Sequence, residues 1–328
     1  MTQFLPVEKK PKPVYQQDWK AYTESQTNEL TFFMKLLADL CTNVEQPEYE
    51  FGRPSLPYSD LVFASALKVY STKSLRRFMS HLQHAQSAGH ISISCTYVSI
   101  SNFMRKSELT TILKELIKIT SLPLSTIETT LGVDSTGFST SRFGRYYNFK
   151  YGKDRLQKEW IKAHVCSGVK TNIVTAVELT EVNKGDSPFF IPLMEKSAQV
   201  FELKEAVADK AYSSRENLEF VKKLGGEAII PFRSNATGRS KGSWAWKKMY
   251  HYFMLNREEF LKRYHQRSNC ETVFHMVKSK FGDSVRSKDK TAQFNEVLLK
   301  ILCHNICVVI QEIHELGIAA DFTKKAET

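Results

Sequence analysis

The sequence predicts a mixed α/β fold, in which a mixed five-stranded sheet flanked by helices follows an all-helical region. Two patterns lead to this prediction. Up to about residue 117, apolar residues recur at helical spacing, most clearly in ELTTILKELIKI at 108–119. After residue 127, β-branched runs alternate with helical runs in the order three strands, helix, strand, helix, strand, helix. A chain of 328 residues, 42% of them hydrophobic, can bury a sizeable core.

The region before residue 127 is expected to contain only helices. Its first residues, roughly 25 in number, are polar and interrupted by proline, which is typical of a flexible arm. Helices are expected at 28–42, 59–71, 73–86, 97–106 and 108–119, with a linker at 48–60 and a turn at Gly89. Between residues 61 and 107 this region is basic and lacks acids, so it resembles a helix-turn-helix unit in outline, as many small helical bundles do.

The mixed region begins with a strand that is expected to end at Asp134 in IETTLGVDSTGFST. A later short strand is expected to end at Asp209. The remaining strands are predicted at 159–168, 171–181 and 227–233, and the helices at 185–198, 214–226, 244–282 and 293–315. Asp186 or Ser187 is expected to cap the first of these helices, and the third is expected to break near Asn256. We therefore expect three parts: an arm, helix and linker (1–54), a basic helical DNA-binding region (55–126), and the mixed domain with its C-terminal helix (127–328).

The positive charge is concentrated in two blocks. The chain has 46 Lys and Arg against 35 Asp and Glu, a formal charge of +11. Residues 61–107 carry +6 and residues 227–290 carry +8, so the rest of the chain is slightly acidic. Concentrated basic surface attracts phosphate backbones through counterion release, although solvated helix faces give the same pattern.

Several classes of protein are disfavoured by what the sequence lacks. The longest apolar run, 297–313, is interrupted by Lys300, His304 and Asn305, and the N-terminus has no apolar signal segment. Six scattered cysteines without a C-x-x-C pair do not form a disulfide or zinc framework, and Cys303 and Cys307 are expected in the core. Neither a nucleotide phosphate loop nor a G-x-S-x-G elbow occurs. We expect a cytoplasmic, nucleoid-associated protein without a membrane partner.

Polar residues form one stripe on the helix around Glu271. On a helical wheel Tyr264, Arg267, Glu271 and Lys278 fall within about 60° of one another. Another face carries apolar residues that can pack on a sheet, namely Val273, Phe274, Val277 and Phe281. Taken alone, the stripe is an ordinary i,i+4 ion pair between Arg267 and Glu271 on a solvated face.

Two aspartates change that interpretation. Asp134 and Asp209 are each expected at the end of a strand. Two carboxylates side by side in a partly dry site repel each other unless a divalent cation lies between them. A third carboxylate from a helix would complete an oxygen cage for a hard cation.

Three segments together resemble the DDE transposases of bacterial insertion sequences: GVDSTGF, VADKAYSS and YHQRSNCETVFHMVK. The last fits the Y-(2)-R-(3)-E-(6)-K signature of one large branch at all four letters. The resemblance extends from residue 55 to about 290. It implies a ribonuclease H-like catalytic domain at 127–328, in which the first and fourth strands are neighbours and place Asp134 and Asp209 side by side.

The resemblance also implies roles for individual residues. Asp134, Asp209 and Glu271 would be the catalytic triad and the ligands of two Mg²⁺ ions, which Mn²⁺ would replace. Tyr264, Arg267 and Lys278 would contact DNA phosphates near the cleaved end. Further DNA contacts are expected from two sets of basic residues, Arg142 and Arg145 in an aromatic-rich loop, and Arg76, Arg77, Arg105 and Lys106 in the helical region.

The sequence differs from some DDE transposases in the interval between the second and third acidic residues. Only 62 residues separate Asp209 from Glu271, which leaves no room for the large β-rich insertion found in some relatives. Trp244 and Trp246 lie in this interval and could stack on a flipped base, but core packing is the more common role of such residues.

The resemblance implies an enzyme that acts on double-stranded DNA. It would bind the terminal inverted repeats of its element, cut there with Mg²⁺ and join the ends to target DNA, as a homo-oligomer in a synaptic complex. Two alternatives stay open: a DNA-binding regulator or domesticated protein that keeps the fold without the chemistry, and a ribonuclease H-like nuclease that cleaves without strand transfer.

Overall fold

A computed structural model describes residues 18–48, 51–52, 54–140, 150 and 160–323. Arg142 and Arg145 lie outside these ranges, as does most of the expected N-terminal arm. The expectation of an arm as far as residue 25 was wrong, because a helix begins at Trp19, where the Asp18 side chain accepts hydrogen bonds from the first turn.

Six helices precede the sheet in the described part of the chain. They are α1 (Trp19–Thr27), α2 (Glu29–Cys41), α3 (Tyr58–Tyr70), α4 (Leu75–Ser87), α5 (Tyr97–Phe103) and α6 (Ser107–Ser121). The predicted helical segments from residue 28 onward are confirmed, with shifts of a few residues at their ends. Gly89 has φ 79°, so the predicted turn after α4 uses a backbone conformation that glycine adopts without strain.

The sheet has five strands in the order β3-β2-β1-β4-β5. Its strands are β1 (Thr130–Ser139), β2 (Trp160–Gly168), β3 (Val174–Glu181), β4 (Glu205–Ala208) and β5 (Glu227–Ile229). The first three are antiparallel, whereas β4 lies parallel to β1 and to β5, so the sheet is mixed as expected. The predicted adjacency of the first and fourth strands is confirmed.

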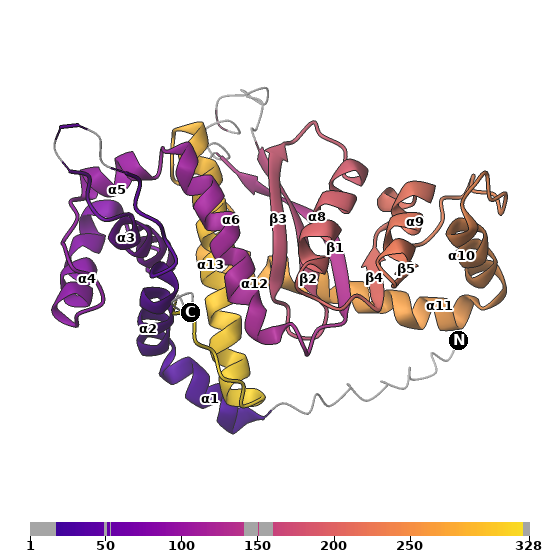
Figure 1. The fold of residues 1–328 in the computed structure, drawn as a ribbon, viewed down its shortest axis with the longest axis horizontal. Helices are drawn as coiled ribbons and strands as arrows, with labels where there is room; N and C mark the ends of the chain where they lie inside the picture. Colours follow the sequence, from indigo (N-terminus) through magenta and orange to yellow (C-terminus); the bar gives the residue numbers. More distant parts are fainter. Residues whose placement is uncertain (1–17, 49–50, 53, 141–149, 151–159, 324–328) are drawn as a thin grey trace, which may run out of the picture.

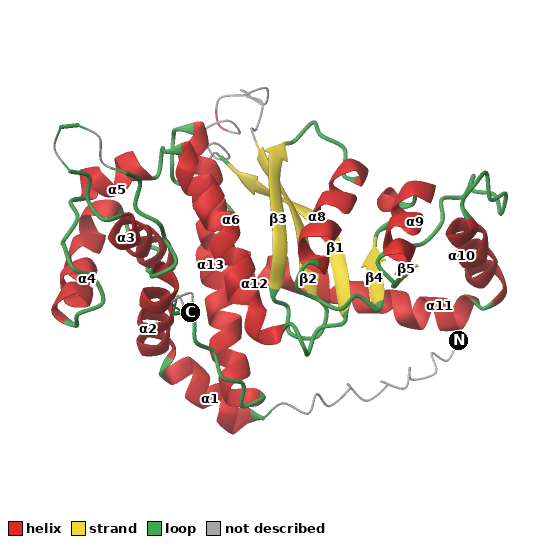
Figure 2. Cartoon of the chain, viewed as in Figure 1, coloured by secondary structure: helices red, strands yellow, loops and turns green. Residues whose placement is uncertain are grey.

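Helices cover the sheet on both faces (Figures 1 and 2). On one face, a nearly continuous helical run, α11 (Arg257–Tyr264) followed by α12 (Ser268–Phe281), passes over β5, β4, β1 and β2 in turn. The longest helix, α13 (Lys290–Glu315), packs beside α6 between the sheet and the N-terminal helices. Helices α8 (Phe190–Ala198), α9 (Arg215–Lys223) and α10 (Trp244–Leu255) join a second apolar cluster with β4 and β5.

The larger apolar cluster runs across residue 126. It includes Phe33 from α2, Phe63 from α3, Leu113 from α6, Val165 from β2 and Leu302 from α13. Of the described helices, α13 is long and apolar enough to span a membrane, but 78% of its apolar window is buried in protein, as in a core helix. The helical region and the sheet therefore share one core, whose centre is α13.

Two expectations about helix and strand ends were wrong. β1 does not end at Asp134 but continues to Ser139, because its antiparallel pairing with β2 extends that far; only its parallel pairing with β4 stops at Val133. Asp186 does not cap a helix through its side chain. It precedes a short 3₁₀ turn with helical φ and ψ, and its carboxylate instead lies 2.6 Å from Nζ of Lys162.

Candidate active site

Alternate residues of β1 face α12. Successive side chains of a strand point to opposite faces, so Gly132, Asp134, Thr136 and Phe138 share one face. Three of these positions meet α12 or the turn before it: Gly132 faces Cys270, Asp134 faces Arg267, and Thr136 faces Lys278. Asp134 and Thr136, two residues apart on β1, therefore face Arg267 and Lys278 of the polar stripe.

Gly132 allows α12 to approach the sheet closely. A Cβ atom at this position would lie 2.1 Å from Sγ of Cys270 and 3.3 Å from Cγ2 of Val207. Cys270 is buried, and burial raises the pKa of its thiol to about 12, so it acts as a packing residue. The missing side chain at Gly132 therefore sets the distance between β1 and the helix that carries Glu271.

Arg267 joins two of the three acidic residues. Its Nη2 lies 2.8 Å from Oδ2 of Asp134, and its Nη1 lies 3.0 Å from Oε1 of Glu271. It occupies a 3₁₀ turn (His265–Arg267) between α11 and α12, which directs the guanidinium towards β1. The side chain of Asp134 is 14% exposed, whereas that of Glu271 is 63% exposed. The i,i+4 ion pair expected from the sequence is present, and it extends to the sheet.

Asp209 lies next to Asp134 across the parallel strands. Val133 pairs with Ala208, so the two aspartates each follow the last paired residue of β1 and β4. The Asp209 carboxylate accepts a hydrogen bond from the backbone N–H of Lys210, and Asp134 accepts one from Ser135 at 2.9 Å. Both carboxylates are thereby oriented by the backbone next to them.

The electrostatics of Asp134 show that the three carboxylates share one region. Burial raises the pKa of Asp134 above its ordinary value, and the charges of Glu271 and Asp209 add to this. The Arg267 guanidinium and the Ser135 N–H oppose the rise. Asp134 therefore lies within electrostatic reach of both other predicted acids.

Lys278 and Tyr264 lie on either side of this acidic group. Nζ of Lys278 donates a hydrogen bond to Thr136 Oγ1 at 2.6 Å and lies 5.5 Å from the ring centroid of Phe138. Burial lowers the pKa of Lys278, with Asp283 opposing. Tyr264 packs on Phe260, and burial raises the pKa of its hydroxyl. Both side chains are therefore held at the site by packing as well as by polar contacts.

The residue that anchors α11 could not be recognised from the sequence. Arg263 donates from Nε to Glu205 Oε1 at 3.0 Å and from Nη2 to Glu227 Oε2 at 2.8 Å. These two glutamates begin β4 and β5, so one arginine fixes the helix across two strands. Sequence spacing cannot indicate such pairs, because their partners are 36 and 58 residues away.

The donor set suits a hard divalent cation in its chemistry. Carboxylate oxygens are the ligands that Mg²⁺ prefers, and two such groups lie side by side on neighbouring strands. Polar atoms without hydrogen-bond partners in the described chain are also buried here, namely Tyr212 Oη, Ser213 Oγ and Arg267 Nε. Among the described residues, however, no three potential ligands are gathered at coordinating distance, and Arg267 lies between Asp134 and Glu271.

The basic residues predicted in the helical region have different surroundings. Arg76 and Arg77 are exposed on α4, and Arg105 is exposed just after α5. Lys106 instead donates from Nζ to the Tyr58 hydroxyl at 2.6 Å and lies over the Tyr58 ring. The first three are free to meet a ligand, whereas Lys106 also links α6 to α3.

The two tryptophans before α11 differ in exposure. Trp246 is buried, and its indole N–H donates to the carbonyl of Thr237 at 2.8 Å. Trp244 is exposed, with Lys247 over its ring at 5.4 Å. Trp246 is therefore a core residue, and Trp244 is a surface residue.

Asp134 and Asp209 follow the last paired residues of two neighbouring parallel strands, and Glu271 lies on the helix that crosses one face of the sheet. A family model described as a transposase DDE domain matches residues 126–306, which is more than half of the chain. The chain belongs to this family. Among solved structures it is similar to a piggyBac transposase in a synaptic complex with hairpin DNA, determined by cryo-electron microscopy. The TM-score is 0.42 and the identity is 10%, over 88% of this chain and 76% of that one. Membership rests on the domain match alone.

Proposed function

We propose that the protein is a ribonuclease H-like transposase that binds the terminal inverted repeats of its element and catalyses Mg²⁺-dependent strand cleavage and strand transfer. The observation that carries the proposal is the adjacency of Asp134 and Asp209 at the ends of their parallel strand pairing, with Arg267 joining Asp134 to Glu271. The fit of residues 264–278 to the Y-R-E-K signature supports an origin in a bacterial insertion sequence.

In this proposal the three carboxylates hold the metal. Asp134 and Asp209 are oriented by backbone N–H groups, and Glu271 has an exposed side chain that forms an ion pair with Arg267. When bound, two Mg²⁺ ions would activate a water or 3′-hydroxyl and stabilise the leaving 3′-oxygen of a phosphodiester, and Mn²⁺ would serve in the same way.

The cations beside the carboxylates would also help the site to bind DNA. A site made of three acids repels the DNA backbone, and the positive charge of Arg267 and Lys278 offsets that repulsion. The Arg267 fork can hold carboxylate or phosphate oxygens, whereas Lys278 supplies a point charge. The exposed residues Arg76, Arg77 and Arg105 would contact the repeat from the helical region at 55–126, in a homo-oligomeric synaptic complex.

The test is a cleavage and joining assay with a plasmid that carries both ends of the element. With Mg²⁺ or Mn²⁺ the wild-type chain should cut at the ends and join them to a second DNA. Cleavage without a joined product would favour a nuclease. DNA binding with neither cleavage nor Mn²⁺ binding would favour a regulator that keeps only the fold.

A further inference from the structure

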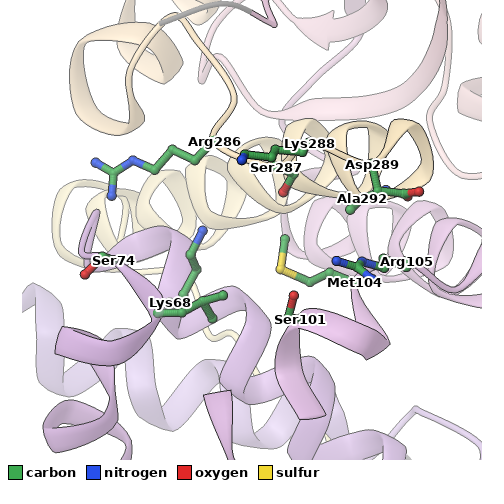
Figure 3. A pocket seen from close by; sticks show the side chains of 11 residues that line it. Lys68, Ser74, Ser101, Met104, Arg105, Arg286, Ser287, Lys288, Asp289 and Ala292 are labelled. Carbon is green, nitrogen blue, oxygen red and sulfur yellow. The ribbon is translucent and has the colours of Figure 1, made fainter. Parts of the chain in front are cut away.

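A basic cavity lies where the N-terminal helices meet the segment that leads into α13 (Figure 3). Its volume is about 340 Å³. One wall comes from α3, α4 and α5, and the other from residues 286–292. Four cations line it, namely Lys68, Arg105, Arg286 and Lys288. The first two belong to the first basic block of the sequence and the last two to the second, so the fold brings the two blocks together here.

Within the described ranges none of these four cations has a carboxylate oxygen within 4.0 Å, although the charge of the buried Glu296 opposes the fall in the pKa of Lys68. The acid in the lining is Asp289, whose carboxylate accepts the N–H of Ala292 at 3.0 Å and so caps α13. Lys68 is 6% exposed, and burial lowers its pKa. Figure 3 shows its ammonium group directed into the cavity, towards Arg286. A buried lysine in this position suits an anionic ligand.

A buried carboxylate fixes the wall of the cavity that residues 286–292 form. Glu296 accepts the backbone N–H of Arg286 at 3.0 Å, and the N–H and hydroxyl of Ser287 at 2.9 and 2.7 Å. Both oxygens of the Glu296 carboxylate therefore accept hydrogen bonds from the loop. The loop is thereby fixed in the position from which Arg286 and Lys288 line the cavity.

The same loop is joined to the strand that carries Asp134. The N–H of Ser139, the last residue of β1, donates to the carbonyl of Asp283 at 3.0 Å, and the N–H of Val285 donates to the carbonyl of Ser139 at 2.9 Å. Because these hydrogen bonds join the loop to β1, a ligand bound by Arg286 would have a fixed position relative to that strand.

The cavity continues into a second hollow of about 430 Å³ on α4 and α5. The two share Ser74, Leu75, Ser101 and Arg105. The second adds Arg76, whose guanidinium lies 5.0 Å from the ring centroid of Tyr97. We call the two hollows together the seam groove. An elongated groove with cations along its length fits a chain of phosphates better than a single anion.

We propose that the seam groove binds the sugar–phosphate backbone of DNA, with Lys68, Arg105, Arg286 and Lys288 facing successive phosphates. The proposal rests on the proposed function and names a surface for it that is separate from the carboxylate site. It gives residues 286–288 the task of fixing the DNA relative to β1.

The test compares two double variants of the full chain. Arg286→Gln with Lys288→Gln removes two groove cations. Lys222→Gln with Lys223→Gln removes two exposed lysines at the end of α9, so the net charge is the same. Affinity for a labelled duplex is measured over a range of salt concentrations. The groove variant should bind about tenfold more weakly and lower the salt slope by about two, while the control stays within about twofold of wild type.

A third variant and a small anion separate the remaining outcomes. Lys68→Met keeps the length of the buried side chain and should also weaken duplex binding. Equal duplex affinity in the groove and control variants would overturn the proposal. The proposal would also be overturned if inorganic pyrophosphate raised the thermal unfolding midpoint of the wild-type chain but did not change its affinity for the duplex. The cavity would then serve a small phosphate compound. Failure of the wild-type chain to bind any duplex would count against the proposed function as well.

Discussion

Nη2 of Arg267 lies 2.8 Å from Oδ2 of Asp134, and the same guanidinium holds Glu271 through Nη1 at 3.0 Å. One residue therefore positions two of the three carboxylates of the site. The two acids come from different elements, a strand and the helix that crosses it, so Arg267 fixes the helix to the sheet at the place where the proposed chemistry occurs.

Substitution of Arg267 by Lys should reduce strand cleavage about tenfold or more, because an ammonium group cannot hold two carboxylates as a planar fork does. The thermal unfolding midpoint should fall as well, since loss of a charged hydrogen bond to a largely buried carboxylate costs about 2 kcal/mol. Cleavage at the wild-type rate by Arg267→Lys would show that the fork is not needed to position the acids.

Substitution of Gly132 by Ala should destabilise the chain by about 1–3 kcal/mol, because the new methyl group would collide with Cys270. Adding Cys270→Ala should recover most of that loss. Chemical denaturation of the single and double variants measures both effects. Gly185→Ala serves as a control, since a Cβ there meets nothing within 4 Å. A Gly132→Ala variant as stable as this control would contradict the close packing of α12 on β1.

Asn305 ties α13 to the edge of the sheet. Its Oδ1 accepts the N–H of Val174 at 2.9 Å, and its Nδ2 donates to the carbonyl of Val174 at 2.7 Å and to Thr120 Oγ1 at 3.0 Å. Asn305→Leu leaves these buried groups unpaired and should lower the free energy of unfolding by about 3 kcal/mol. Gln311→Leu on the same helix should change it by less than about 0.5 kcal/mol. Similar losses in the two variants would argue against this anchor.

Glu312 makes the stability of the fold depend on pH. Burial raises the pKa of its carboxyl group to about 7, and the carboxylates of Glu315 and Glu128 add to this. Below pH 4.5 the group is protonated in both the folded and unfolded chains. Between pH 4.5 and 7 the unfolded chain loses the proton first, so the free energy of unfolding falls as the pH rises.

Glu312→Gln removes this contribution. The variant should be more stable than the wild type at pH 8, by an amount on the order of 1.4 kcal/mol or more, and equal to it near pH 4.5. Denaturant unfolding across this pH range measures the difference. Glu115→Gln on the exposed side of α6 should follow the wild-type profile. If Glu312→Gln also followed it, the raised pKa of Glu312 would be wrong.

Much of the fold could be predicted because it depends on local periodicity. The order of strands and helices after residue 127 follows from β-branched runs and apolar spacing, and the break at Asn256 is confirmed by the end of α10 there. The polar stripe was also predicted, since residues three, four and seven positions apart share a helix face, but the 3₁₀ turn at His265–Arg267, which separates Tyr264 and Arg267 from α12, was not.

The rest depends on contacts between distant residues. The end of β1 could not be found from its own sequence, because the pairing with β2 carries it five residues past Asp134. The role of Gly132 depends on Cys270, and that of Arg263 on Glu205 and Glu227. The seam groove likewise requires knowledge that residues 286–288 lie against α3 and α5, which charge counts along the chain could not supply.

The most direct test of the central claim is the rate at which Asp209→Asn cleaves the ends of the element in Mg²⁺. Asp283→Asn is the control, because it removes one exposed carboxylate from the loop that follows α12. We predict a loss of at least about a thousandfold for Asp209→Asn, with DNA affinity retained, and a rate near wild type for the control. Cleavage by Asp209→Asn at the wild-type rate would contradict the assignment of the site.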